Sequence, residues 1–385
     1  MTYAAYRRYW ISSVAAVCGF QMLIFSEGWL GYKLTGSPLF LGYVGAATAV
    51  PAIVLNLFGG VLADRLDKRV LIMVSNWILV ALVTALGTMR IFDLLVPWHL
   101  LVASFITGAV SAFNQPAHQS LFPHLIDRRV MASAVALNSS IWQGSRIIAP
   151  ALAGVVIAVA GTALAFYLSA LGFAVLAFVV MTFRIPNVGS QETAPGLTSV
   201  VEGLTYIRRN PAFWFLIGMT FFNSFFGMAY ISLMPVFAVE VLKVGSEGQG
   251  ILLMFSGVGS LGTSLYLGAR ATGSPSLRVI GGAVLTGASL ATFALTSRFL
   301  GSYPLALGLM ILVGVGNSLY MVSIMSALQI MVPDHLRGRV MGFYGMTWSI
   351  MPLGGMQAGA LANLIGAHFA IAIGGIAVTA FALGP

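Results

Sequence analysis

The stretch Gly60-Val-Leu-Ala-Asp-Arg-Leu-Asp-Lys-Arg69 is a charged break between two apolar runs, at 39–62 and 70–89. Each run reaches the roughly 20 residues that a helix needs to cross a bilayer. Gly60 allows two helices to approach closely, and Asp64 can accept hydrogen bonds at a helix N-terminus. The stretch therefore predicts a cytoplasmic turn between two membrane-spanning helices. The alternative is an ordinary basic loop without a special role.

The composition extends this pattern to the whole chain. Apolar residues make up 59% of the 385 residues and charged residues 8%, whereas a soluble domain carries about 25% charged residues. These values disfavour a soluble enzyme, a nucleic-acid-binding protein and a disordered chain. One span with its turn takes about 32 residues. We therefore predict an all-α polytopic membrane protein with twelve transmembrane helices.

Apolar runs bounded by charged residues or by Gly/Pro turns place the spans. The first six are predicted at 9–31, 39–62, 70–89, 97–121, 131–159 and 162–183. The other six are predicted at 211–238, 248–269, 278–296, 303–331, 339–364 and 366–384. The domains that follow are an N-terminal six-helix bundle over 1–183, a cytoplasmic linker over 184–210 and a C-terminal six-helix bundle over 211–385.

The basic residues predict the orientation. With the N-terminus in the cytoplasm, fourteen of the 19 Lys and Arg lie in inner segments, four lie in outer segments, and Arg146 lies within a span. Cytoplasmic loops of membrane proteins are enriched in Lys and Arg, so we expect both termini in the cytoplasm. This bias explains the net charge of +9 without a nucleic-acid partner. The run that begins at Tyr9 is too long for a signal-peptide core, so we expect an uncleaved first span. The last span ends at Gly384-Pro385 and is either minimal or clipped.

The two halves contain an internal repeat. Gln119, Pro123 and the triplet Arg129-Val-Met131 recur as Gln329, Pro333 and Arg339-Val-Met341, with the same offset of 210 residues. Further along, Ala153-Gly154 with Gly161 is echoed by Ala358-Gly359 with Gly366. Each copy of the segment from Gln to Arg-Val-Met lies at a predicted inner loop, between spans 4 and 5 or between spans 10 and 11. Two six-span halves in parallel repeat are typical of transporters that bind their substrate near the membrane midplane.

These motifs resemble those of the major facilitator superfamily. Gly60, Asp64 and the basic residues after them follow the order of its 2–3 loop signature. The first outer loop, Trp29-Leu-Gly-Tyr-Lys-Leu-Thr-Gly-Ser-Pro38, is similar to that of the bacterial exporter branch containing macrolide and enterobactin efflux proteins. Further similar segments are 116–119, 134–139, 146–154, 203–211 and 333–341. The resemblance covers nearly the whole chain and is specific to a branch, not to a substrate.

The sequence also departs from the family pattern. Asn114 and His118 stand where members often have Asp and Arg, and small residues replace glycines of the span-5 antiporter motif at Ser145, Ala149 and Ala153. Many drug/proton antiporters carry an acidic residue deep in span 1 or span 4. Span 4 of this chain has none.

The resemblance implies secondary active export of small amphipathic compounds of drug, macrolide or siderophore type, by proton antiport with alternating access. The alternative within the same fold is a lysophospholipid or lipid flippase, or a facilitator without proton coupling. A membrane sensor or an intramembrane enzyme would need a signalling domain or an acid–base constellation, and the sequence shows neither, so we expect no enzyme.

The expected location is the bacterial cytoplasmic (inner) membrane. The expected partners are a small-molecule substrate, the lipid bilayer and protons, with a monomer as the default state. The histidines and the lone Cys18 lack metal-ligand spacing, and no phosphate-binding glycine loop is present. We therefore expect neither a metal nor a cofactor.

Two formal charges lie well inside predicted spans, Glu27 and Arg146. Ionisable groups are costly in lipid, so both are functional candidates. Their depths, about 25 Å and 22 Å from the inner ends of spans 1 and 5, predict a pair that protonation of Glu27 would break. Alternatively, Glu27 lies in the outer interface and Arg146 bonds helix carbonyls. His118 is the third proton-coupling candidate, as a titrating gate residue or as a hydrogen-bonded structural histidine.

Phe222, Phe226 and Tyr230 are spaced four residues apart and are predicted to share one face of span 7. Aromatic rings and methionines make a large, polarizable surface suited to amphipathic ligands; the alternative is that these rings face lipid. The substrate-cavity candidates are Phe20, Gln21, Ile24, Met219, Phe222, Asn223, Phe226, Tyr230, Asn317, Tyr320, Met321 and Ile324. The resemblance further implies a gating motif of Gly60, Asp64, Arg65, Lys68, Arg69, Pro150, Gly154, Asp334, Arg337 and Arg339.

Overall fold

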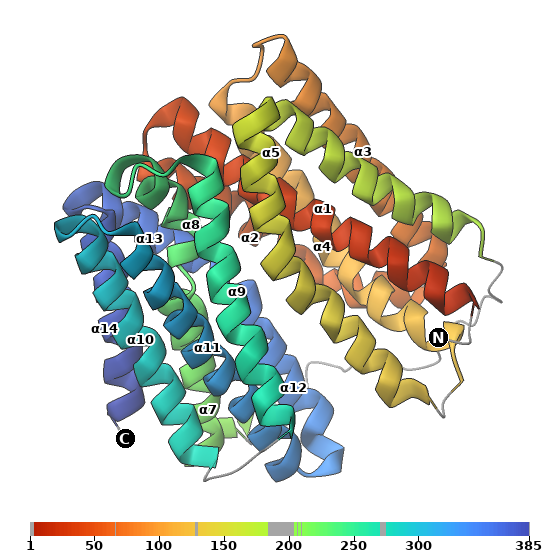
Figure 1. The fold of residues 1–385 in the computed structure, drawn as a ribbon. Coiled ribbons are helices and arrows are strands. Elements are labelled where there is room, and N and C mark those ends of the chain that lie inside the picture. The colour runs from red at the N-terminus through yellow and green to blue at the C-terminus, as the bar shows by residue number, and fades with distance from the viewer. Residues whose placement is uncertain are drawn as a thin grey trace. The chain divides into compact units, whose positions relative to one another are not determined.

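The chain is all-helical in the part that its computed structural model describes, and the fold prediction is confirmed (Figure 1). The described residues are 4–65, 67–127, 130–183, 204–205, 207–208, 210–269 and 275–384. The first elements are α1 (Ala4–Thr35), α2 (Pro38–Arg65), α3 (Lys68–Ile91), α4 (Pro97–Leu121), the short η1 (Phe122–Leu125) and α5 (Met131–Met181). The later helices are α7 (Pro211–Phe222), η3 (Asn223–Gly227), α8 (Tyr230–Val236), η4 (Phe237–Val241), α9 (Gly245–Ala269), α10 (Pro275–Phe299), α11 (Tyr303–Met331), α12 (Asp334–Ser349), α13 (Met351–Ile365) and α14 (Ala367–Leu383).

Each of the twelve predicted spans coincides with helix. Among the described residues, nine helical stretches are long and apolar enough to cross a membrane. This count takes α5 as one stretch and omits α12, α13 and the short α14, so the number twelve stays a prediction. Most of the predicted linker 184–210 lies outside the described residues.

Local sequence signals explain where two of the helices begin. Asp67 precedes α3, and its Oδ1 accepts a hydrogen bond from the backbone N–H of Arg69 at 2.8 Å. Asn210 precedes α7 and accepts in the same way from the backbone N–H of Ala212 at 3.1 Å. Such a cap stabilises a helix by about 1 kcal/mol. An acidic residue of the charged break therefore marks the start of the third helix.

The long helix α5 contains a backbone break at Gly161, where φ is 81° and ψ is 171°. This conformation is essentially restricted to glycine. The break falls between the predicted spans 131–159 and 162–183. These two spans therefore follow one another without an intervening loop.

The predicted span 211–238 is not one regular helix. After α7, the segment η3 is a π-helix, and a second π-helix, η4, follows α8. The i→i+5 hydrogen bonds join Met228 N–H to the Asn223 carbonyl and Leu242 N–H to the Phe237 carbonyl, both at 2.8 Å. Single π-turns inside longer helices are rare and are frequently found at functional sites.

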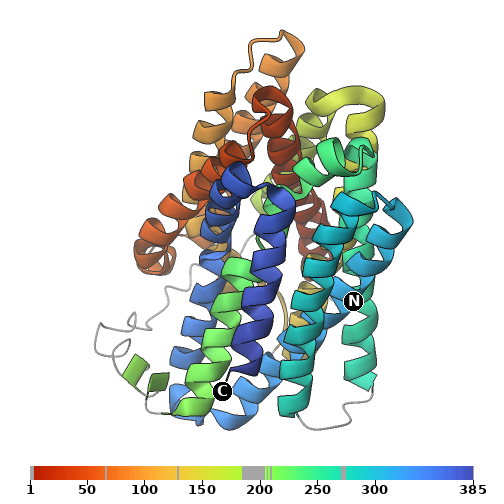
Figure 2. The same cartoon turned by 90° about the vertical axis from the view of Figure 1, so that its left-hand side faces the viewer.

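The chain divides into two compact units. Unit 1 consists of Met1–Gly36, Ala47–Ala194 and Ser246–Gly250, and unit 2 consists of Ser37–Ala46, Pro195–Gly245 and Ile251–Pro385. In unit 1, α1 packs along α5, and α3 contacts both α4 and α5. In unit 2, α10 packs against α11 and α14, and Figure 2 shows α7 (bright green) beside α14 (dark blue), which also contact each other. The predicted bundle boundaries, 1–183 and 211–385, stay predictions.

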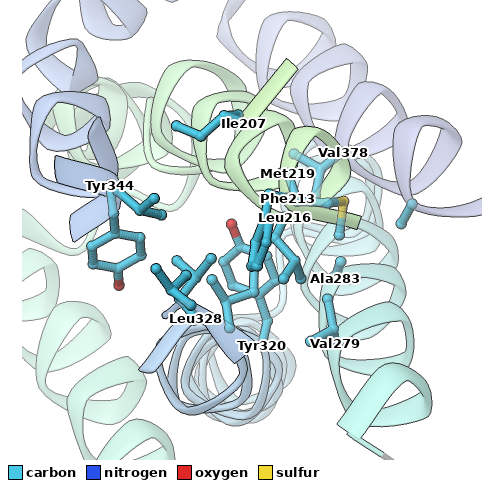
Figure 3. Packing of buried hydrophobic residues seen from close by; sticks show 14 residues of the cluster. Ile207, Phe213, Leu216, Met219, Val279, Ala283, Tyr320, Leu328, Tyr344 and Val378 are labelled. Carbon is cyan, nitrogen blue, oxygen red and sulfur yellow. The ribbon is translucent and has the colours of Figure 1, made fainter. Parts of the chain in front are cut away.

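The core of unit 2 is built from the facing sides of α7, α10, α11, α12 and α14 (Figure 3). Tyr320 lies at its centre, next to Phe213 and Leu216 of α7, and is among the largest fully buried side chains. Because lipid tails are as apolar as these side chains, tight van der Waals packing supplies most of the attraction between such helices. Met219 and Ile324 belong to the same cluster.

Candidate transport site

Glu27 is the buried carboxyl of unit 1. Its side chain is only 3% exposed. One carboxylate oxygen, Oε2, accepts a hydrogen bond from the Ser104 hydroxyl of α4 at 3.2 Å. The other oxygen, Oε1, is buried and has no hydrogen-bond partner among the described residues. Burying a carboxylate without a cation is energetically costly, so Glu27 is a candidate functional residue.

The predicted pair between Glu27 and Arg146 is not formed in this structure. No ion pair joins the two residues, although both are described; Glu27 faces Ser104 instead. Arg146 adjoins Ser145, whose hydroxyl lies 3.3 Å from the Cys18 thiol. Residue 18 is about 13 Å from residue 27 along α1 at 1.5 Å per residue. Arg146 therefore lies at a different depth from Glu27, and it is half-buried.

His118 is hydrogen-bonded, as in the structural alternative given above. Its Nδ1 lies 2.6 Å from the Tyr9 hydroxyl, and the two rings are tilted with centroids 5.9 Å apart. The bond ties α4 to the inner part of α1. A titrating gate role for His118 stays a prediction.

A cavity of about 130 Å³ lies inside unit 1. Its walls come from α1, α3, α4 and both halves of α5. Its polar lining residues are Tyr9, Ser13, Asn76, Ser111, Asn114, Gln115, His118, Gln119 and Asn138. Its aromatic lining residues are Phe20, Trp142 and Phe173. Of the residues predicted for substrate contact in span 1, Phe20 therefore lines a cavity, whereas Gln21 does not line it and Ile24 is 44% exposed.

The candidates on spans 7 and 10 meet at an amide pair. The Asn223 side-chain amide donates to Asn317 Oδ1 at 3.2 Å, and the Asn317 amide lies 3.8 Å from the Met228 sulfur. Asn223 is the first residue of the π-helix η3. The structure thus brings Asn223 and Asn317 together where the helix departs from regular geometry.

The predicted aromatic face of span 7 divides in two. Phe222 stacks on Phe381 of α14 with ring centroids 4.1 Å apart, and Phe226 lies 5.5 Å from Phe222. Tyr230 is buried instead, with its hydroxyl 3.3 Å from that of Ser256 in α9. The i, i+4 rule assumes a regular α-helix, and η3 widens the turn between Phe226 and Tyr230.

The remaining cavity candidates differ in how accessible they are. Met219, Tyr320 and Ile324 are buried in the core of unit 2 and face neighbouring helices. Met321 is half-buried and packs against that core. In this conformation, Phe222, Phe226, Asn317 and Met321 are the candidates of spans 7 and 10 that retain exposed area.

The gating motif is only partly described. The surroundings of Gly60 and the side chains of Asp64, Arg65, Asp334, Arg337 and Arg339 lie outside the described part of the chain. Arg69 donates from Nη2 to the Met181 carbonyl at 3.4 Å, and Lys68 is half-buried.

Pro150 and Gly154 lie in a tight helix contact within unit 1. The Ser246 hydroxyl donates to the Gly154 carbonyl at 3.0 Å. A Cβ at Gly154 would lie 2.4 Å from the Ser246 carbonyl oxygen, and one at Gly250 would lie 2.4 Å from the Pro150 carbonyl oxygen. Both contacts are with backbone, which cannot move aside. The small residues of this α5 face therefore allow the first residues of α9 to approach closely.

Sequence reasoning missed several of these features. Asn76 is an amide inside an otherwise apolar run, and this was the available signal for a polar cavity wall on α3. The hydroxyl of Ser104 gave no comparable signal, because a serine within a span commonly bonds its own helix. The π-helices carry no recognised sequence mark.

A family model described as "Transmembrane secretion effector" matches residues 1–384. The chain belongs to this family. Membership makes it a multi-pass membrane transporter of the major facilitator type.

Several curated relatives resemble this family member over much of its length. It is 27% identical over 371 residues to "Uncharacterized MFS-type transporter YfiS" of Bacillus subtilis, covering 89% of this chain and 83% of the relative. It is 24% identical to "Multidrug efflux pump Tap" of Mycolicibacterium fortuitum, covering 93% and 89% of the two chains. It is 26% identical to the "Staphyloferrin A transporter" of Staphylococcus aureus over 64% of each chain.

Among solved structures, a bacterial homologue of the human lysosomal transporter Spinster, inward-facing and occupied, superposes with a TM-score of 0.76. The sequences are 14% identical, and the match covers 100% of this chain and 94% of the other. At this identity the likeness shows the fold alone. The fold is that of the family.

Proposed function

We propose that this chain exports small amphipathic compounds, of drug, macrolide or siderophore type, across the bacterial inner membrane. Export runs from the cytoplasm, where both termini lie, by alternating access between the two bundles. Support comes from relatives named as a multidrug efflux pump, macrolide efflux proteins and a staphyloferrin transporter. The same family model spans the chain.

Proton antiport is the proposed energy source. The observation that supports it is the buried carboxyl of Glu27. The carboxyl is buried between α1 and α4 and accepts a hydrogen bond from the Ser104 hydroxyl, and no cation among the described residues forms an ion pair with it. A hydrogen bond to a charged carboxylate is about twice as strong as one between neutral groups. Proton binding at Glu27 therefore changes the α1–α4 contact. A ligand that interacts differently with two conformations shifts the balance between them, and here the ligand is the proton.

The half-exposed rings of Phe222 and Phe226, beside the Asn223–Asn317 amide pair, are the proposed substrate surface of unit 2. The rings supply apolar area and the Asn317 amide supplies polar contacts. Such a surface suits molecules that are apolar on one side and polar on the other.

The second candidate function is a lipid or lysophospholipid flippase, or a facilitator without proton coupling. One observation favours it: span 4, residues 97–121, contains no acidic residue. Glu27 would then be a structural group, and its replacement by Gln would leave transport intact.

Drug susceptibility in an efflux-deficient bacterial host separates these functions. The host expresses the wild type, Glu27→Gln or the control Glu240→Gln, which makes the same change at an exposed carboxyl. The panel contains macrolides, dyes, tetracyclines and siderophores, each with and without a protonophore. We expect the wild type and Glu240→Gln to confer resistance that both the protonophore and Glu27→Gln abolish. Resistance that survives Glu27→Gln would remove Glu27 as the proton carrier, and absence of any phenotype in cells whose membranes contain the protein would favour the flippase.

A further inference from the structure

We propose that the cavity inside unit 1 is a binding subsite for an uncharged, hydrogen-bonding ring of the transported molecule. This inference rests on the proposed export function for its physiological meaning, but it concerns binding alone. The cavity includes walls from α3 and from the second half of α5, so it lies within the N-terminal unit.

Among the described residues, the lining of the cavity includes no Asp, Glu, Lys or Arg. Glu27 and Arg146, the two charged residues inside spans of this unit, are absent from it. A carboxylate or ammonium group placed here would lose its hydration without gaining a charged partner, and burying an unpaired charge is far more costly than burying a neutral polar group. The cavity therefore selects against both anions and cations.

Unused hydrogen-bonding capacity points into the same region. Asn114 Oδ1 is buried and has no hydrogen-bond partner among the described residues, whereas the Ser13 hydroxyl interacts with the Tyr9 side chain. By contrast, Asn76 uses its amide on the Ile72 carbonyl at 2.8 Å, and His118 Nδ1 is engaged by Tyr9. Buried polar atoms in native proteins almost always have partners. Asn114 Oδ1 is therefore the group that a bound donor would satisfy, and the Ser13 hydroxyl is a second polar group of the lining.

The apolar walls fit the flat face of a ring. Phe20 and Trp142 meet edge to face with ring centroids 6.5 Å apart, and Phe173 contributes a third ring to the lining. Aromatic walls favour flat or apolar ring faces, and a few placed polar groups fix the orientation.

The volume sets the size of the ligand group. The cavity measures about 130 Å³, whereas a protein cavity of about 150 Å³ is known to hold benzene. One six-membered ring with a single polar substituent fits, and a whole drug molecule does not. The cavity would therefore hold one ring of a larger substrate.

Three ring-sized probes of matched shape test the charge selection: benzamide, benzoate and benzylammonium. Their binding to the purified full chain in lipid nanodiscs is measured by ligand-observed saturation-transfer NMR, with empty nanodiscs as the blank. We expect benzamide to bind with a dissociation constant of about 1 mM, in the range of fragments. We expect the two charged probes to show no signal above the blank.

Variants locate the binding within the cavity. Asn114→Leu should weaken benzamide binding about fivefold, and Ser13→Ala about threefold, as expected for the loss of one neutral hydrogen bond. Ser169→Ala is the matched control, because this buried serine lies in the same unit, bonds the Ala165 carbonyl of its own helix and does not line the cavity. Folding of each variant is judged by its elution volume and its melting temperature. If one cavity variant fails to fold, benzamide binding to the other variant still tests the inference.

The inference is overturned if no probe binds, since the cavity is then a water-filled void. It is also overturned if benzoate or benzylammonium binds as well as benzamide, or if both folded cavity variants bind benzamide like Ser169→Ala. Because no transport is measured, these outcomes leave the export proposal standing. Loss of export in the susceptibility assay would conversely leave the binding result intact.

Discussion

Gly161 and Gly366 hold the same backbone conformation 205 residues apart in the chain. Gly161 has φ 81° and ψ 171°, and Gly366 has φ 91° and ψ 149°. Each follows the helix that carries its half's copy of the Ala-Gly pair, and each precedes the last helix of that half. The internal repeat seen in the sequence therefore extends to a backbone geometry that only glycine adopts readily.

Gly161→Ala should lower the stability of the chain by about 1–3 kcal/mol, because Ala is strained at this positive φ. A Cβ at Gly161 would meet nothing within 4 Å, so crowding contributes nothing. The measurement is the melting temperature of the purified chain. Gly144→Ala is the control, since its Cβ also meets nothing and its backbone is helical; it should be neutral or slightly stabilising. Equal melting temperatures for the two variants would contradict the strain argument.

Ser104→Ala should slow export by about tenfold in the wild-type background, which corresponds to about 1.4 kcal/mol. It should have less effect in Glu27→Gln, because Glu27→Gln has already replaced the charge-assisted hydrogen bond from Ser104 by a weaker neutral one. Initial efflux rates in proteoliposomes with an imposed pH gradient, for the two single variants and the double variant, give the coupling energy. Directly interacting residues couple by about 0.5–3 kcal/mol. Strictly additive effects would show that the Ser104 contact is unrelated to coupling.

Arg146→Ala and Glu27→Gln should act independently. The two side chains are not paired, and Arg146 lies near the level of Cys18. Their effects on the efflux rate should add to within about 0.5 kcal/mol. The same proteoliposome assay with the double variant measures this. A large non-additive term would mean that the pair forms in another conformation of the transport cycle.

Breaking one side of the Asn223–Asn317 amide pair should destabilise unit 2 more than removing both. Asn317→Leu alone should cost about 1–3 kcal/mol, because the buried Asn223 amide loses its partner. Asn223→Leu alone should cost less than this, because Asn317 retains exposed area. The double variant should lie closer to the wild type. Thermal unfolding of the three variants compares these cases. A double variant that is as unstable as the sum of the singles would indicate that each amide has other essential partners.

The spans were predictable because the length of each apolar run can be read directly from the sequence, without knowledge of how the helices pack. Runs such as 97–121 and 303–331 coincide with α4 and α11 to the residue. The cap at Asp67 depends likewise on residues close together in the sequence, because Asp67 accepts a hydrogen bond from the backbone N–H of Arg69. Whether the chain has twelve spans or fewer depends on how breaks such as Gly161 are counted.

The relation between two helices was less predictable. Counting residues from the inner ends of the spans placed Glu27 and Arg146 at the same depth. However, α1 begins at Ala4, before the predicted start at 9. The length of an apolar run also does not determine the axial position of one helix relative to its neighbour. The aromatic face of span 7 stays a prediction; the spacing of Phe226 and Tyr230 on which it rests assumes a regular helix, whereas η3 is a π-helix. Whether a π-turn forms depends on the packing around the helix, and residue types alone do not indicate where one forms.

The two π-turns of span 7, at 223–227 and 237–241, each accommodate one residue more than an α-turn of the same height. A helix can take in or expel such a surplus residue without displacing its flanks. Span 7 therefore has a built-in allowance in chain length, and a one-residue deletion between 223 and 227 should leave its ends where they are. Alignments of relatives with a one-residue gap at this point would describe the same span in its regular form.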